Sequence, residues 1–141
     1  TIDIQESRLT LYNEGSWVNM LEDPEASNNM ACVMPTAGAN WAVQARVDND
    51  MYGKWHVYVS VKIDPIAKSG TAFTTGIYDT EKKTDVVSYT AKIEDMPDKQ
   101  YKLIDLGVRD LKSECYFWFA PANNPTEVKT ISVDRIFLVA E

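Results

Sequence analysis

The hydrophobic pattern of this chain alternates with a period of two in three separate segments. In residues 55–63 every odd position is apolar, and the even positions are His, Tyr, Ser and Lys. Residues 41–47 and 115–119 alternate in the same way. Because successive side chains of a strand point to opposite faces, each segment has one core face and one outer face. The pattern therefore predicts strands whose outer faces carry polar and aromatic groups.

The same pattern predicts about nine strands along the chain. They are expected at residues 2–12, 31–34, 41–47, 55–63, 72–78, 86–93, 101–106, 114–119 and 130–139. Turn-rich pieces separate them, and residues 106–112 are expected to form a helical turn at most. Many short strands at regular spacing indicate an all-β fold, an antiparallel β-sandwich. With no internal repeat and no linker, residues 1–141 are expected to be a single module.

Composition and charge narrow the classes of partner. The chain has 141 residues and a formal net charge of −7, which disfavours nucleic acid and anionic membrane surfaces as partners. No apolar run approaches the ~20 residues of a membrane span. The chain starts at Thr1 without a Met or a basic segment, so we interpret it as a module cut from a longer polypeptide.

The two cysteines, Cys32 and Cys115, lie far apart in the sequence and outside any CxxC or His spacing. That spacing disfavours a zinc site. Both fall at apolar positions of predicted strands, which indicates buried free thiols, and a disulfide between two strands is the alternative.

The outer faces of three predicted strands supply a candidate binding surface. If these strands are neighbours, one face collects Gln44, Arg46, His56, Tyr58, Lys62, Tyr116 and Trp118. Aromatic rings stack on the apolar faces of sugars, and long polar side chains bond their hydroxyls. Trp41 and Trp55 fall on the apolar phase and are expected in the core. The loop residues Trp17 and Tyr52 are alternatives that could line a pocket at the sandwich edge.

Four segments carry a resemblance to a known family. They are Asp-Pro-Glu-Ala-Ser-Asn-Asn at 23–29, Trp-Ala-Val-Gln at 41–44, Gly-Lys-Trp-His-Val-Tyr-Val at 53–59, and a closing strand with the lone Asp134. In this order the chain resembles the galactose-binding-domain-like jelly rolls, and among them the carbohydrate-binding modules of glycoside hydrolases. The resemblance implies non-catalytic binding of a poly- or oligosaccharide. It also implies a catalytic domain in the same polypeptide, within a secreted or cell-surface protein.

In such modules a structural calcium ion commonly ties the first loop to the final strand. The resemblance assigns this role to Asp23, Asn28 and Asp134, with Glu6 as an additional carboxylate. These side chains offer the oxygen ligands that calcium prefers. The alternative is that Asp134 pairs with Arg135 or a loop amide and that Asp23 caps a turn.

Catalysis has little support in the sequence. His56 is the only histidine, and no nucleophile motif surrounds a Ser or Cys. We therefore expect no enzyme activity from the chain itself. Two other functions stay open: an accessory domain that packs on a catalytic domain, and a small polysaccharide lyase that uses His56, Tyr58 and Arg46.

Overall fold

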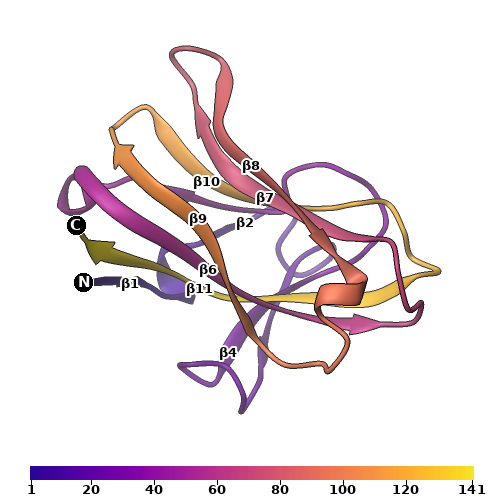
Figure 1. Cartoon of the computed structure of the whole chain (residues 1–141). Helices are drawn as coiled ribbons and strands as arrows, with labels where there is room; N and C mark the ends of the chain where they lie inside the picture. Colours follow the sequence, from indigo (N-terminus) through magenta and orange to yellow (C-terminus); the bar gives the residue numbers. More distant parts are fainter.

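The computed structural model of this protein describes residues 1–141 and consists of two antiparallel β-sheets packed face to face (Figure 1). The six-stranded sheet has the order β3-β4-β11-β6-β9. Strands β1 and β4 pair with the same edge of β11, β4 with its first half and β1 with its second half. The five-stranded sheet has the order β2-β5-β10-β7-β8. The strands are β1 (Ile2–Ile4), β2 (Thr10–Leu11), β3 (Asn19–Glu22), β4 (Met30–Met34), β5 (Val43–Arg46), β6 (Gly53–Pro65), β7 (Thr71–Asp79), β8 (Thr84–Lys92), β9 (Lys102–Leu111), β10 (Cys115–Pro121) and β11 (Val128–Ala140).

Three short 3-10 helices, η1 (Glu6–Arg8), η2 (Asn49–Met51) and η3 (Ile93–Asp95), interrupt the strands. None of them has the length or the apolar character to cross a membrane. The predicted all-β antiparallel sandwich is confirmed.

The core lies between the two sheets and consists of the inward-facing apolar side chains of their strands. On β6, Val57 and Val61 are fully buried, and on β10 the inward residues Phe117 and Phe119 are 1% or less exposed. Burying each such side chain contributes roughly 1.5–3 kcal/mol relative to leaving it in water. The alternation that predicted the strands is therefore also what holds the sheets together.

Strand β11 changes its inward phase at Asp134. Ile131 and Val133 point inward before this residue, and Ile136 and Leu138 point inward after it, because the pairing with β6 shifts register there. A β-bulge of this kind inserts one extra residue and redirects a side chain. It explains why a carboxylate interrupts an otherwise apolar strand and is itself buried, at 4% exposure.

Three boundaries differ from the prediction. The single strand expected at residues 2–12 is divided, because η1 carries the chain from β1 in one sheet to β2 in the other. Strand β3 was not predicted. The helical turn expected at residues 106–112 is wrong: β9 continues to Leu111 through a register shift at which Gly107 adopts a positive φ of 85°.

Both cysteines are buried free thiols. Cys32 lies on β4 in the six-stranded sheet and Cys115 on β10 in the five-stranded sheet, and the alternative disulfide does not join them. Burial is the main cause that raises the pKa of Cys32 to about 12 and the pKa of Cys115 above its ordinary value.

Candidate functional site

The structure divides the predicted outer-face set between two sheets. Strands β5 and β10 are neighbours in the five-stranded sheet, where Arg46 pairs with Tyr116 and Gln44 pairs with Trp118. Strand β6 belongs to the other sheet, so His56, Tyr58 and Lys62 lie on the opposite side of the sandwich. The prediction of one shared face is wrong for these three residues, because alternation gives the phase of a strand but not its neighbours.

Two cross-strand rows form the outer face of the five-stranded sheet. One row runs from Arg46 through Tyr116 to Tyr78 on β7. The adjacent row runs from Gln44 through Trp118 to Gly76. Side chains in such rows stand about 4.5–5.5 Å apart at Cβ and contact one another.

Trp118 forms the lower layer of an aromatic cluster. It is 5% exposed, and its indole Nε1 donates a hydrogen bond of 3.1 Å to Asp85 Oδ1 on β8. The ring passes so close to Gly76 that a Cβ atom there would lie 2.9 Å from its Cζ2 atom. Trp118 is therefore fixed by its close packing on Gly76 and by the hydrogen bond from its indole N–H to Asp85.

Trp41 forms the upper layer. Its ring stacks on Trp118 at a centroid distance of 5.4 Å with 6° between the planes, and it meets Tyr78 edge-on at 5.1 Å. The expectation that Trp41 belongs to the core is wrong. Regular pairing of β5 begins only at Val43, so the alternation does not extend to Trp41.

We call Trp41, Tyr78, Tyr116 and Trp118 the aromatic platform. Trp41, Tyr78 and Tyr116 are half-buried, so they remain partly open to solvent, while Trp118 lies beneath Trp41. Tyr78 could have been found from the sequence, because it lies on the outward phase of the predicted strand at residues 72–78.

Two hollows flank the platform at strand β5. Gln44 lines one of them together with Thr10, Leu11, Tyr12, Asn13 and Ala42. Arg46 lines the other together with Arg8, Val47, Asp48, Asn49, Asp50, Tyr52 and Ser113. Tyr52, which the sequence offered as an alternative, thus lies at the border of the same face, and Trp17 instead packs against the core and the ring of Tyr12.

A dense ion cluster fixes the wall of the second hollow. Arg8 donates to Asp50 at 2.8 and 3.1 Å and to Asp48 at 2.9 Å. These bonds raise the pKa of Arg8, and the bond from Arg8 lowers the pKa of Asp50. The cluster ties η1 to the loop that contains η2.

On the opposite sheet, His56 and Tyr58 form a separate stacked pair, 4.5 Å apart at an angle of 10°. Asp105 lies 2.7 Å from His56 Nε2 and also accepts the backbone N–H of Gly107. The Gly107 bond first and the His56 bond second lower the pKa of Asp105. Since Arg46 lies on the other side of the sandwich, the three residues of the lyase alternative do not share a site.

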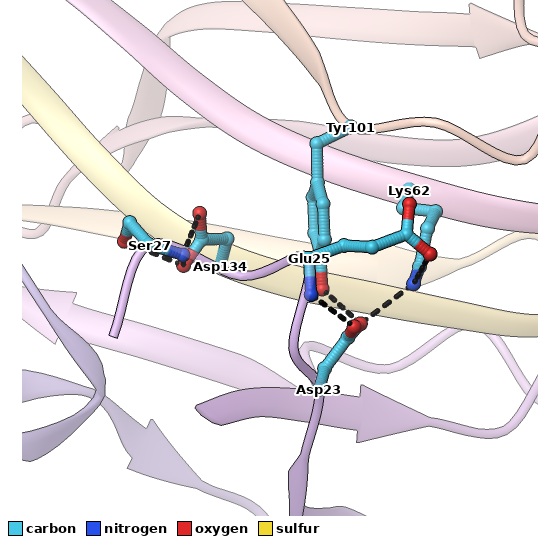
Figure 2. Close-up of polar contacts among 6 residues, drawn as sticks. All are labelled: Asp23, Glu25, Ser27, Lys62, Tyr101 and Asp134. Carbon is cyan, nitrogen blue, oxygen red and sulfur yellow. Dashed lines mark hydrogen bonds and ion pairs between the residues drawn. The ribbon is translucent and has the colours of Figure 1, made fainter. Parts of the chain in front are cut away.

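The remaining predicted residue of β6, Lys62, is bound within the protein (Figure 2). Its ammonium group donates to Asp23 Oδ2 at 2.6 Å and lies 3.7 Å from Glu25 Oε1. Tyr101 donates its hydroxyl to the same Asp23 oxygen at 2.7 Å, and the N–H of Glu25 donates to Oδ1. Burial raises the pKa of Asp23, but the bonds from Lys62, Tyr101 and Glu25 outweigh it, so this pKa lies below its ordinary value.

This network bears on the expected roles of Lys62 and Asp23. The Lys62 side chain is only 17% exposed and is held by carboxylates, so it does not present a free donor to a sugar. The Asp23 carboxylate accepts three hydrogen bonds from within the protein, which favours the alternative that it fastens the loop rather than binding calcium. Together with Tyr101, which immediately precedes β9, these residues fasten the loop before β4 to β6 and to the start of β9.

The other three residues expected to bind calcium gather at a different point. Asp134 Oδ1 accepts from the Ser27 hydroxyl at 2.9 Å, both its oxygens accept from the Ser27 N–H, and Asn28 donates to Glu6 Oε1 at 2.5 Å. Burial raises the pKa of Asp134, and the second oxygen of Glu6 is buried without a partner.

After burial, the negative charges of Glu6 and Asp134 both contribute to raising the pKa of the Cys32 thiol. No group of three or more His, Cys, Asp or Glu side chains is positioned to hold a metal ion. The buried carboxylate of Asp134 and the half-buried carboxylate of Glu6, beside amide and loop oxygens, nevertheless fit calcium, which accepts amide and backbone oxygens as ligands.

Comparisons with known proteins agree on the architecture. No protein-family model matches the chain, and no curated protein matches it. Among solved structures, it is similar to the CBM22-1 xylan-binding domain of Xyn10C from Paenibacillus barcinonensis, with a TM-score of 0.62 and 12% identity over 99% of this chain and 94% of that one. The C-terminal family 22 carbohydrate-binding module of Clostridium thermocellum Xyn10B gives a TM-score of 0.63 and 13% identity, over 99% and 92%.

A third similar structure is a much longer enzyme. The arabinose-bound α-L-arabinofuranosidase MgGH51 matches 98% of this chain with a TM-score of 0.60 and 11% identity, and this chain spans 25% of it. At these identities the likeness concerns the fold. This chain therefore shares the β-sandwich fold of these two carbohydrate-binding modules.

Proposed function

We propose that this chain binds a polysaccharide on the outer face of its five-stranded sheet, without transforming it. The observation that carries the proposal is the aromatic platform, where Trp41 stacks on Trp118 and meets Tyr78 edge-on. Pyranose rings present flat C–H surfaces that stack on such rings, and Gln44 and Arg46 stand beside the platform to bond the hydroxyls.

The physical task of such a module is attachment. Stacking on partly exposed rings yields only modest affinity after the ordering costs are subtracted. That is sufficient for a module that holds a polysaccharide-degrading enzyme near its substrate, because tethering raises the local concentration of the enzyme. We also propose that the same polypeptide contains a catalytic domain and that the protein is secreted or held at the cell surface. The xylan-binding domains of the same fold support xylan as the first substrate to test.

The test is isothermal titration calorimetry of the chain with soluble xylan, mixed-linkage glucan and mannan. Trp41→Ala should weaken binding at least tenfold, because it removes the upper stacking surface. Tyr58→Ala is the matched control, since Tyr58 is a half-buried aromatic on the opposite sheet. If no glycan binds, or if Trp41→Ala binds as well as the parent, the proposal fails and an accessory packing role replaces it.

We also propose a structural calcium ion held by Glu6, Asn28 and Asp134. The ion would neutralise the carboxylates of Glu6 and Asp134 and fasten the loop before β4 to β11. Such an ion stabilises the native state by mass action. It lies away from the platform, so we assign it no part in contacting the sugar.

A further inference from the structure

Arg46 differs from the other arginines of this chain in having no partner. Arg8 bonds Asp48 and Asp50, Arg135 bonds Asp3 at 2.9 Å, and Arg109 donates to the Leu106 carbonyl. The Arg46 guanidinium forms no hydrogen bond or ion pair, and the residue is exposed. Its hydrogen-bonding capacity is therefore free for a ligand.

The Arg46 guanidinium lies at one end of the aromatic platform, within reach of a ligand bound there. Arg46 pairs across the sheet with Tyr116, and its other side faces the hollow that Tyr52 and Ser113 also line. The two carboxylates of that hollow, Asp48 and Asp50, are bound to Arg8. Both carboxylates are therefore paired with Arg8, and neither contacts Arg46.

A guanidinium is suited to a carboxylate because its planar fork donates two parallel N–H bonds to the two oxygens. A neutral sugar uses only part of that geometry. We propose that Arg46 makes the platform selective for a polysaccharide that bears a uronic acid unit, whose carboxylate binds Arg46 while the neighbouring sugar ring lies against Tyr116. This inference rests on the proposed function, since it specifies the glycan that the same face takes.

The charge of the whole chain limits the kind of acidic glycan. The formal net charge is −7, so a densely charged polyuronate is repelled at long range. A single carboxylate on an otherwise neutral backbone meets Arg46 with much less repulsion. The ligand class is therefore a neutral polysaccharide with sparse uronic acid side groups.

The experiment compares two matched probes by calorimetry. One is a xylo-oligosaccharide that carries one glucuronic acid group, and the other is the same oligosaccharide after reduction of its carboxyl group to a primary alcohol. The parent should bind the acidic probe about five- to tenfold more tightly, as one exposed charge-assisted pair allows. The preference should shrink at high salt because the pair is screened.

Variants assign the preference to one side chain. Arg46→Gln should bind both probes equally, and Arg46→Lys should keep part of the preference. Arg109→Gln removes the same charge from β9 of the opposite sheet and should keep all of it. Equal binding of both probes by the parent, or an unchanged preference in Arg46→Gln, overturns the inference and leaves sugar binding intact. Failure of both probes and of every neutral glycan overturns the proposed function as well.

Discussion

Replacing Gly76 with Ala tests whether the lower layer of the platform is as tightly packed as the structure shows. The added methyl group would overlap the carbonyl oxygen of Val87 and lie 2.9 Å from Cζ2 of Trp118. Carbon atoms are best separated by about 3.5–4.0 Å, so the indole must tilt or β7 must move from β8. Overpacking of this kind costs about 3 kcal/mol, at the upper end of its usual range because one of the atoms is backbone.

The loss should be visible in both stability and binding. For a domain of this size, 1 kcal/mol corresponds to about 4 °C in melting temperature, so Gly76→Ala should melt about 12 °C below the parent. Tilting Trp118 also removes the support beneath Trp41. The loss of one aromatic contact, about 1.4 kcal/mol, should weaken glycan binding about tenfold.

The assay is thermal unfolding followed by calorimetric titration with xylan well below the melting temperature. Gly15→Ala is the control: Gly15 has a φ of 89° and no heavy atom within 4 Å of an added Cβ. That variant should lose about 1–2 kcal/mol from backbone strain alone and bind normally. If Gly76→Ala melts and binds like the parent, the described packing of Trp118 is wrong.

Three further predictions concern other parts of the molecule. Trp118→Ala should lose about 3–5 kcal/mol in urea unfolding, since this side chain is buried, whereas Trp41→Ala should lose much less. EDTA should lower the melting temperature and calcium should restore it in the parent and in Asp23→Asn; restoration in Asp134→Asn would contradict the calcium site. The lowered pKa of Asp23 stabilises the fold above the ordinary pKa near 3.8, and this contribution disappears as the pH falls through the lower folded value. The difference in urea midpoint between the parent and Asp23→Asn should therefore be largest at pH 6 and should shrink as the pH falls below 3.8; a difference that stays constant would refute the role of the Lys62 bond.

The fold was predictable from the sequence because its physical signal is local. Alternation over residues 55–63 reports directly which side chains of β6 enter the core, and the strand is found there. Neighbour relations between strands are set by long-range packing, which alternation does not report. For that reason the condition that all three strands are neighbours holds for β5 and β10, and it fails for β6, which lies in the other sheet.

The candidate site was only partly predictable for a related reason. Arg46, Tyr116 and Gln44 share one outer face, as expected, because they lie on regular strands. Trp41 was misplaced because it precedes the first paired residue of β5 and its ring folds back over Trp118. The bond between Lys62 and Asp23 was not predicted, because the two residues are 39 positions apart and no local pattern encodes such a contact.

The rates at which the two buried thiols are alkylated can report how often each sheet of the sandwich opens. Only a thiolate reacts with an alkylating reagent, so Cys32 and Cys115 should be labelled only when their surroundings open. Each reports on a different sheet, Cys32 on β4 and Cys115 on β10. Equal labelling rates would mean that the sandwich opens as one cooperative unit, whereas unequal rates would identify the sheet that separates first.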